Sequence, residues 1–295
     1  MAWKGVHLSQ PARLSLADGQ MVVEQADAAV RLPLEDVAWV VLDTPQATLT
    51  AGLLSACMEA GLAIITTDRT HTPNGVALPF HGHHRQAEMA WKQVGMGAPL
   101  KKRLWQAVVR RKILNQSATL TALGRDGAKV VAEMARHVGS GDPDNVEARA
   151  ARQYWQSLFD GFRREDEEDR RNKLLNYGYA IVRSAIARAL VAGGLLPAFG
   201  IHHASVANAF NLADDLIEPF RPFADRLAFA QTAQADGPDL TLADRRAMAG
   251  VLSADCRMNG AITPLLAATE QTSNSLCRAI AANDADALIL PEPAG

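Results

Sequence analysis

The pattern of apolar residues changes once along this chain, and that change most constrains what it can fold into. Up to about residue 80, short apolar runs alternate with turn-forming residues, which is typical of β-strands. Beyond residue 85, apolar residues recur with the three- and four-residue spacing of amphipathic helices. The sequence therefore predicts an α+β protein, with a small β-rich N-terminal domain that contains one helix, followed by a larger all-α domain.

This change divides the chain into four expected parts. The β-rich domain covers 1–72, a linker rich in Pro, Gly and His covers 73–85, the helical domain covers 86–282, and 283–295 forms a flexible tail. The simplest arrangement of the first part is one small sheet with a helix over 50–61. Strands are expected within 6–8, 13–16, 21–23, 29–32, 37–42 and 62–66, and further helices within 100–123, 130–138, 146–159, 174–192 and 212–232.

Composition excludes several classes of protein. The 295 residues are 48% hydrophobic and 21% charged, which suits one or two globular domains and excludes collagen-like, coiled-coil and globally disordered chains. No apolar run reaches the 18 or more residues of a membrane span, and the N-terminus lacks the apolar segment of a signal peptide. The three cysteines form neither a disulfide framework nor a CxxC metal site. We therefore expect a cytoplasmic protein with no membrane partner.

Positive charge is concentrated in one segment. The net charge is −2, yet residues 85–125 hold nine basic residues and a single acidic one. Such a segment can bind the phosphate backbone of DNA, and the alternative interpretation is a solvated helix face. Arg103 is followed seven and eight residues later by Arg110 and Arg111, so these three arginines share one helical face. The candidate DNA-binding residues are Lys101, Lys102, Arg103, Arg110 and Arg111.

The helical domain contains three candidate sites. Glu147 follows Asp144 by three residues, so a capping box at a helix start competes with a functional role. His202 and His203 are adjacent in a loop between two apolar helices, where at most one of them faces a given site, and a partly buried polar role is the alternative.

The third candidate site lies in 211–222. Asp215 and Glu218 share a helix face, where two carboxylates repel each other unless a cation or a proton lies between them. Arg221, three residues after Glu218, can instead pair with it. Asp214 has the position of a structural residue near a helix start.

One imidazole with two or three carboxylates favours a hard cation, Mg²⁺ or Mn²⁺, over Zn²⁺. A straight helix would separate His203 from Glu218 by about 22 Å, so a shared metal requires a bend within 204–211.

Four segments, in this order, resemble the CRISPR-associated adaptation integrase family, the first-numbered universal Cas protein. They are 144–155, 176–180, 194–203 and 210–222. Each motif is weak alone, whereas their order and spacing are specific. The His-His and Asn-Leu-Ala-Asp-Asp forms look most like the type II branch, subtype II-C.

The resemblance implies a metal site of Glu147, His203 and Glu218, with Asp215 as a possible helper ligand. Many relatives have aspartate where this chain has Glu218, and the longer side chain reaches the same metal. The implied reaction is spacer integration, in which a 3′-hydroxyl of a short duplex DNA attacks a phosphodiester at the edge of a CRISPR repeat. The resemblance also implies a homodimer through the β-rich domain, and a heterohexamer with a small ferredoxin-like partner.

Two alternatives stay open. A stand-alone, metal-dependent, structure-specific repair nuclease would use the same residues. A non-catalytic DNA-binding scaffold would have no need of a helix face that carries paired carboxylates.

Overall fold

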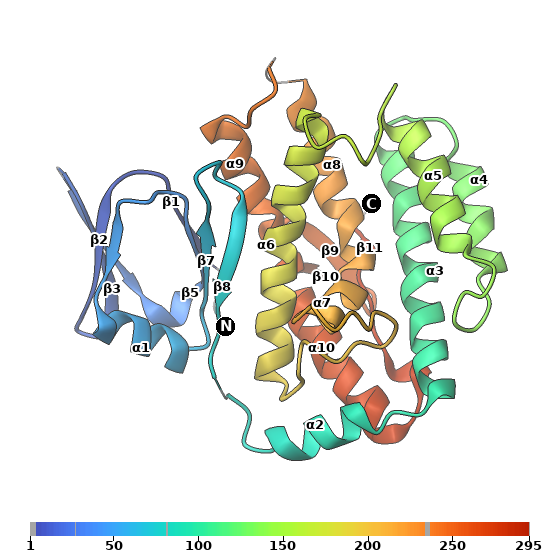
Figure 1. Ribbon diagram of the computed structural model, residues 1–295, viewed down its shortest axis with the longest axis horizontal. Coiled ribbons are helices and arrows are strands. Elements are labelled where there is room, and N and C mark those ends of the chain that lie inside the picture. Colours follow the sequence, from blue (N-terminus) through green and yellow to red (C-terminus); the bar gives the residue numbers. More distant parts are fainter. Residues whose placement is uncertain (1–3, 27, 81, 234–236, 295) are drawn as a thin grey trace. The chain divides into compact units, whose positions relative to one another are not determined.

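The computed structural model describes residues 4–26, 28–80, 82–233 and 237–294. The chain divides into two compact units, 1–84 and 85–295. The first is rich in strands and the second is mainly helical (Figure 1). The α+β class is therefore confirmed, with the β-rich part at the N-terminus.

The first unit contains two sheets among its described residues, where the sequence analysis expected one. The first sheet has the order β1-β5-β7-β8, with β1, β5 and β7 parallel and β8 antiparallel to β7. The second has the order β4-β3-β2-β6, an antiparallel meander with β6 parallel to β2. The strands are β1 (Lys4–Leu8), β2 (Ala12–Ala17), β3 (Gln20–Gln25), β4 (Ala28–Pro33), β5 (Val37–Leu42), β6 (Ala47–Leu49), β7 (Ala63–Thr67) and β8 (Pro73–Ala77).

The helix expected over 50–61 is present as α1 (Ala51–Glu59). Thr50 caps it, since its hydroxyl accepts a hydrogen bond from the Leu53 amide at 3.3 Å. The helix buries Leu53 and Cys57 in one apolar core with residues of both sheets. Strand β5 is buried along nearly its whole length, as expected for a strand with parallel neighbours.

Part of the predicted linker 73–85 has regular structure, because residues 73–77 form the edge strand β8, which pairs with β7. Helix α2 begins at Gln86, directly after the predicted linker. An edge strand tolerates the proline that suggested a turn, because the N–H that proline lacks is not needed on the open side.

The second unit is built around two long helices, α3 (Ala98–Ala122) and α6 (Arg170–Ala192). Helices α4, α5 and α8 pack on α3, while α8, α9 and α10 pack on α6 (Figure 1). Gly193 and Gly194 end α6 as predicted, with Gly194 at a φ of 78°. The other helices are α2 (Gln86–Val94), α4 (Ala128–Met134), α5 (Val146–Leu158), α7 (Asn211–Leu216), α8 (Arg221–Thr232), α9 (Leu242–Ala249) and α10 (Leu265–Ala282).

This unit is not all-α, which corrects the sequence prediction. Strands β9 (Asp255–Met258), β10 (Ala261–Pro264) and β11 (Glu292–Pro293) form a small antiparallel sheet in the order β10-β9-β11. The predicted flexible tail supplies β11. It is held on the helices because Asn115 donates to the Pro291 carbonyl at 2.9 Å and Thr272 to the Ile289 carbonyl at 3.0 Å.

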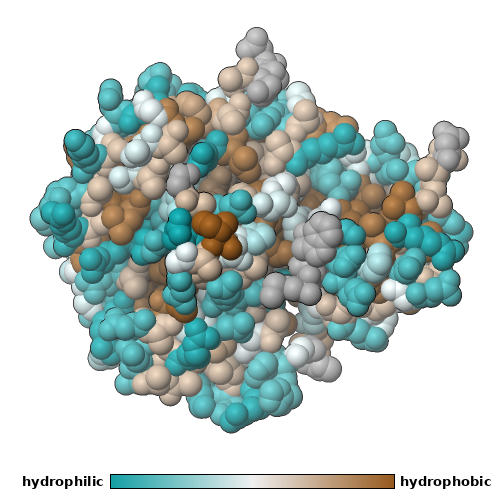
Figure 2. Space-filling view, turned by 180° about the vertical axis from the view of Figure 1, so that it is seen from behind, coloured by the Kyte–Doolittle hydropathy of each residue, from teal (hydrophilic) through white to brown (hydrophobic). Residues whose placement is uncertain are grey.

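In the described part of the chain, no helix combines the length and apolar character needed to cross a membrane. Figure 2 shows hydrophilic residues over much of one face, with smaller hydrophobic areas between them.

Candidate active site

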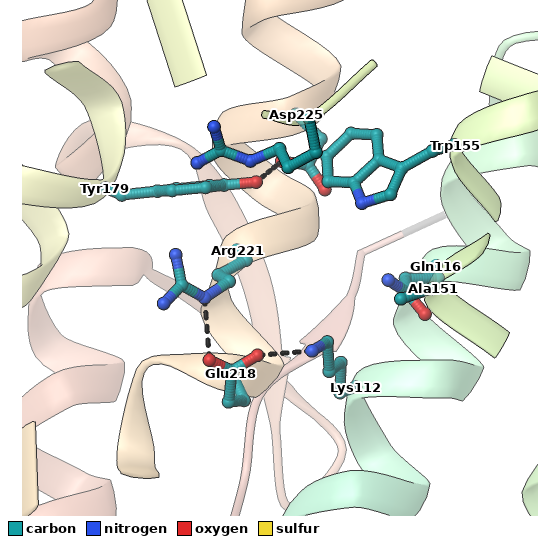
Figure 3. A pocket seen from close by; sticks show the side chains of 9 residues that line it. Lys112, Gln116, Ala151, Trp155, Tyr179, Glu218, Arg221 and Asp225 are labelled. Carbon is teal, nitrogen blue, oxygen red and sulfur yellow. Dashed lines mark hydrogen bonds and ion pairs between the residues drawn. The ribbon is translucent and has the colours of Figure 1, made fainter. Parts of the chain in front are cut away.

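Three side chains from separate elements of the helical unit meet at one point. The Lys112 ammonium, on α3, lies 2.6 Å from Glu147 Oε1 and 2.5 Å from Glu218 Oε2. Glu147 is in the first turn of α5, and Glu218 begins the 3-10 helix η3 (Glu218–Phe220). Figure 3 shows Lys112 pointing at Glu218 from α3. Two of the three predicted catalytic residues thus flank one lysine.

Glu147 is free of the capping role that its spacing suggested. The N-cap of α5 is Asn145, whose side chain accepts from the Ala148 amide, and not Asp144. Asp142 accepts the backbone N–H groups of Val146 and Glu147, each at 2.9 Å. Because other residues cap the helix, the Glu147 carboxylate points at Lys112 instead.

Glu218 is a buried carboxylate between two cations. Arg221 Nε donates to Glu218 Oε1 at 2.8 Å, while Lys112 lies at the other oxygen. The pairing of Glu218 with Arg221 is thus present alongside the predicted site. Burial alone would raise the pKa of Glu218, but the charges of Arg221 and Lys112 outweigh it and lower the pKa to about 2. Burial would likewise lower the pKa of Lys112, but Glu218 and Glu147 raise it. Glu218 and Lys112 are therefore both charged at neutral pH.

The loop between α6 and α7 is folded around Asp215. This carboxylate is fully buried and accepts the backbone N–H groups of Ile201 at 2.5 Å, His202 at 3.0 Å and His203 at 3.0 Å. Gly200 allows this close approach, since a Cβ there would lie 2.7 Å from Asp215 Oδ2 and 2.2 Å from the His203 carbonyl oxygen. The predicted bend within 204–211 is present, and α7 starts at Asn211.

The two adjacent histidines have different surroundings. His202 stacks on Trp105 of α3, with ring centroids 4.2 Å apart. His203 Nδ1 lies 2.7 Å from Asp215 Oδ1. This contact fixes the ring and leaves Nε2 as the ring nitrogen that could bind a metal. The hydrogen bond with Asp215 raises the pKa of His203, and the Glu218 carboxylate adds to this effect. His203 is thus the member of the pair that is electrostatically coupled to the carboxylate site.

The other two acidic residues of the segment 211–222, Asp214 and Asp215, make contacts that hold the local structure. Asp214 pairs with Arg183 through two hydrogen bonds of 2.6 and 2.8 Å, in line with its predicted structural role. Both oxygens of Asp215, the possible helper ligand, are occupied by the loop backbone and His203. The structure therefore gives Asp215 the contacts of a residue that positions the loop.

The candidate ligands are two carboxylates and an imidazole, chemical groups that suit a hard divalent cation. Among the residues that the structure describes, no three His, Cys, Asp or Glu side chains are already arranged around a metal position. Glu147 and Glu218 do converge on one positive charge, the Lys112 ammonium, and hard cations prefer such carboxylate oxygens. A divalent ion at these carboxylates would compete with Lys112 for the same oxygen atoms.

Sequence reasoning assigned Lys112 to the basic segment and missed its place in the site. A signal was present, because Lys112 lies four and eight residues after Val108 and Leu104, on the apolar face of α3. A lysine on a buried helix face requires a carboxylate partner. The basic residues on the other faces of α3 behave differently: Lys102, Arg103 and Arg110 are exposed and Lys101 is half-buried, while Arg111 pairs with Glu292 at 2.7 Å.

A model of the family described as CRISPR associated protein Cas1 matches residues 6–237. The chain belongs to the Cas1 family. It is 42% identical to the CRISPR-associated endonuclease Cas1 of Neisseria meningitidis over 226 residues, which cover 76% of this chain and 74% of that protein.

Two solved structures share the fold. A casposase bound to its integration product aligns with a TM-score of 0.79 at 15% identity, over 96% of this chain and 92% of that one. A chain of a partial Cas6-RT-Cas1–Cas2 complex aligns with a TM-score of 0.65 at 19% identity, over 97% of this chain and 98% of that one. The fold of this chain is therefore also found in a casposase.

Proposed function

We propose that this Cas1 protein is a metal-dependent DNA endonuclease and integrase that inserts short duplex DNA into a CRISPR repeat array. The observation that carries the proposal is the convergence of Glu147 and Glu218 on one cation, Lys112, while the charge of Glu218 also acts on His203, whose ring is fixed by Asp215. The similarity to an endonuclease and to a casposase supports the same chemistry.

In the proposed reaction, a DNA 3′-hydroxyl attacks a phosphodiester of the repeat, and the bond to the leaving 3′-oxygen breaks. DNA supplies both the nucleophile and the leaving group, so no Ser or Cys nucleophile is required. Glu147, His203 and Glu218 would hold Mg²⁺ or Mn²⁺, which would lower the pKa of the attacking hydroxyl and offset the negative charge that develops on the phosphate oxygens. Arg221 keeps Glu218 ionised and oriented through its 2.8 Å hydrogen bond.

The deciding experiment supplies a repeat-containing plasmid and a labelled duplex oligonucleotide, with Mn²⁺ or Mg²⁺ and with or without Cas2. Joined products that require the metal and start at the repeat edge support the proposal. Cleavage of branched DNA with no joining would support a stand-alone repair nuclease. Binding with neither reaction would support a DNA-binding scaffold.

Replacing Lys112 with methionine is expected to make the helical unit depend on a divalent cation. Removing one member of a buried ion pair costs about 3–5 kcal/mol, because Glu147 and Glu218 would face each other without a cation. Calorimetry should show a lower melting temperature without metal and a larger Mn²⁺-induced increase than in the wild type. Lys101→Met is the matched control on the same helix. A Mn²⁺-induced increase no larger than that of the wild type would contradict the expectation.

The exposed basic residues of α3 are proposed to bind DNA phosphates without reading sequence. Each neutralised phosphate adds about 0.9 to the slope of log affinity against log salt concentration. Replacing Lys102, Arg103 and Arg110 together with glutamine should therefore flatten that slope by roughly 2 to 3 for any duplex. Arg111, although predicted for this surface, is left out because it already pairs with Glu292.

The control for this measurement replaces three exposed arginines of the first unit, Arg13, Arg31 and Arg69, with glutamine. Its net charge changes by the same amount as that of the α3 variant. Equal slopes for the two triple variants would show that the α3 residues form only a solvated helix face.

We further propose a homodimer through the β-rich unit, and a heterohexamer in which two such dimers flank a dimer of the ferredoxin-like Cas2. A dimer supplies two sites, as joining both ends of an inserted duplex requires. Light scattering without DNA should give about twice the chain mass of 31.7 kDa. A 31.7 kDa particle at low micromolar concentration would contradict the dimer. The proposal extends to a type II-C system and a cytoplasmic location.

A further inference from the structure

A pocket of about 360 Å³ opens next to the Lys112–Glu218 pair (Figure 3). This volume lies in the range of small-ligand sites. The pocket is polar, and its lining includes three cations and two carboxylates: Lys112, Arg164, Arg221, Glu218 and Asp225. Of these, Lys112, Arg221 and Glu218 are already paired in the candidate active site.

Arg164, in the loop before α6, is a cation held by neutral partners. Its Nη1 donates to Asn172 Oδ1 at 2.8 Å and its Nη2 to Asn176 Oδ1 at 2.6 Å. No ion pair joins it to a carboxylate among the residues that the structure describes. Because amides do not neutralise a guanidinium, the pocket keeps a fixed positive charge with further N–H donors.

One of the two residues that bind Arg164 is itself buried and hydrogen-bonded. Asn172 is 1% exposed, and its amide group donates to the carbonyls of Arg163 and Asp166, each at 2.7 Å. These two bonds use the amide nitrogen of Asn172, so its amide oxygen is turned to Arg164. One of the two amides that place the guanidinium thus belongs to a buried residue, while the other, from Asn176, is exposed.

The other carboxylate of the lining offers this charge little compensation. Asp225 is 1% exposed and accepts from the Tyr154 hydroxyl at 2.9 Å and from the Tyr179 hydroxyl. Burial raises the pKa of Asp225 to about 7, so it is substantially protonated near neutral pH. Arg221, 4.4 Å above the Tyr179 ring, adds positive charge on the same side. The lining is thus net positive and suited to an anion.

We propose that this pocket is a phosphate subsite, in which Arg164 binds a backbone phosphate that adjoins the reacting phosphodiester. The proposal rests on the proposed DNA-joining function. The planar fork of an arginine matches two phosphate oxygens, and the pocket shares Lys112 and Glu218 with the site where the phosphodiester would react. The subsite would hold the strand in register for attack.

The test uses a branched duplex in which the 3′ end of one strand is joined to a target strand. Single phosphates around the junction are replaced in turn by neutral methylphosphonates. Affinity is measured by fluorescence anisotropy in EDTA, so the result does not depend on joining activity. For the wild type, one position next to the junction should weaken binding by about 10-fold or more, as expected for a charge-assisted contact.

Arg164→Gln should lose sensitivity to that one position and keep it at the others, because the contact is already gone. Arg163→Gln, an exposed neighbour with the same charge change, should retain the wild-type pattern. Arg164→Lys keeps the charge without the fork, serves where the glutamine variant fails to fold, and should show a reduced effect at the same position. An unchanged pattern in the Arg164 variants would overturn the subsite. A wild-type protein that binds the duplex but never joins DNA with metal would instead overturn the proposed function.

Discussion

Glu147→Gln is expected to reduce metal-dependent strand transfer by about 100- to 1000-fold or more, which is the typical cost of losing one preorganised electrostatic contact to a transition state. Glutamine preserves the shape of the side chain and can still hydrogen-bond Lys112, so the fold should survive. Its neutral amide, however, is a poor ligand for a hard cation. The rate of oligonucleotide joining at saturating DNA, with Mn²⁺ titrated over a wide range, measures the effect.

Two comparisons make this experiment specific. His203→Ala should be as severe as Glu147→Gln, whereas His202→Ala should be milder, because the His202 ring stacks on Trp105 while the His203 ring is the one bonded to Asp215. Glu218→Ala should also abolish joining, although it leaves Lys112 and Arg221 without a buried partner and must be checked for folding. Joining that survives in Glu147→Gln, or a fatal His202→Ala beside an active His203→Ala, would show the ligand set to be wrong.

The helices were predictable where one apolar stripe decides them. Helix α3 was expected over 100–123 and runs over Ala98–Ala122, since its buried residues recur every three to four positions. Helix α10 was missed, because Thr and Ser occupy several of its buried positions. The tail was misjudged for a related reason. Its Ala- and Pro-rich composition suggests fraying, but Asn115 and Thr272 bind its carbonyl groups, and such long-range polar contacts leave no local pattern.

The candidate site was predictable in part from spacing and resemblance. The residues Glu147, His203 and Glu218 come from three segments, and the structure joins two of them through Lys112, which no motif marked. Tyr154, Tyr179 and Asp225 meet only because α5, α6 and α8 pack together. Periodicity assigns such residues to a helix face. It cannot say which faces meet.

Asp215→Asn is expected to lower both the stability of the helical unit and the joining rate, although Asp215 does not contact Lys112. Four donors surround this buried carboxylate: three backbone N–H groups and His203. An asparagine amide would set its own N–H donors against some of these. Hydrogen bonds to a charged group contribute about 1.5–3 kcal/mol each, so several kcal/mol of the free energy of unfolding should be lost. Calorimetry and the joining assay would measure the two effects.

The position of His203 provides the sharper readout in this variant. Without the Asp215 bond the ring is no longer fixed, so the apparent Mn²⁺ affinity in the joining reaction should fall by about 10- to 100-fold, as for other groups that orient a metal ligand. Asp214→Asn is the matched control, because the adjacent carboxylate pairs with Arg183 instead of the loop. If Asp214→Asn lowered Mn²⁺ affinity as much as Asp215→Asn, the loss would reflect a general loosening of α7. A deficit confined to Asp215→Asn would identify the buried carboxylate as the group that holds the histidine loop in its working conformation.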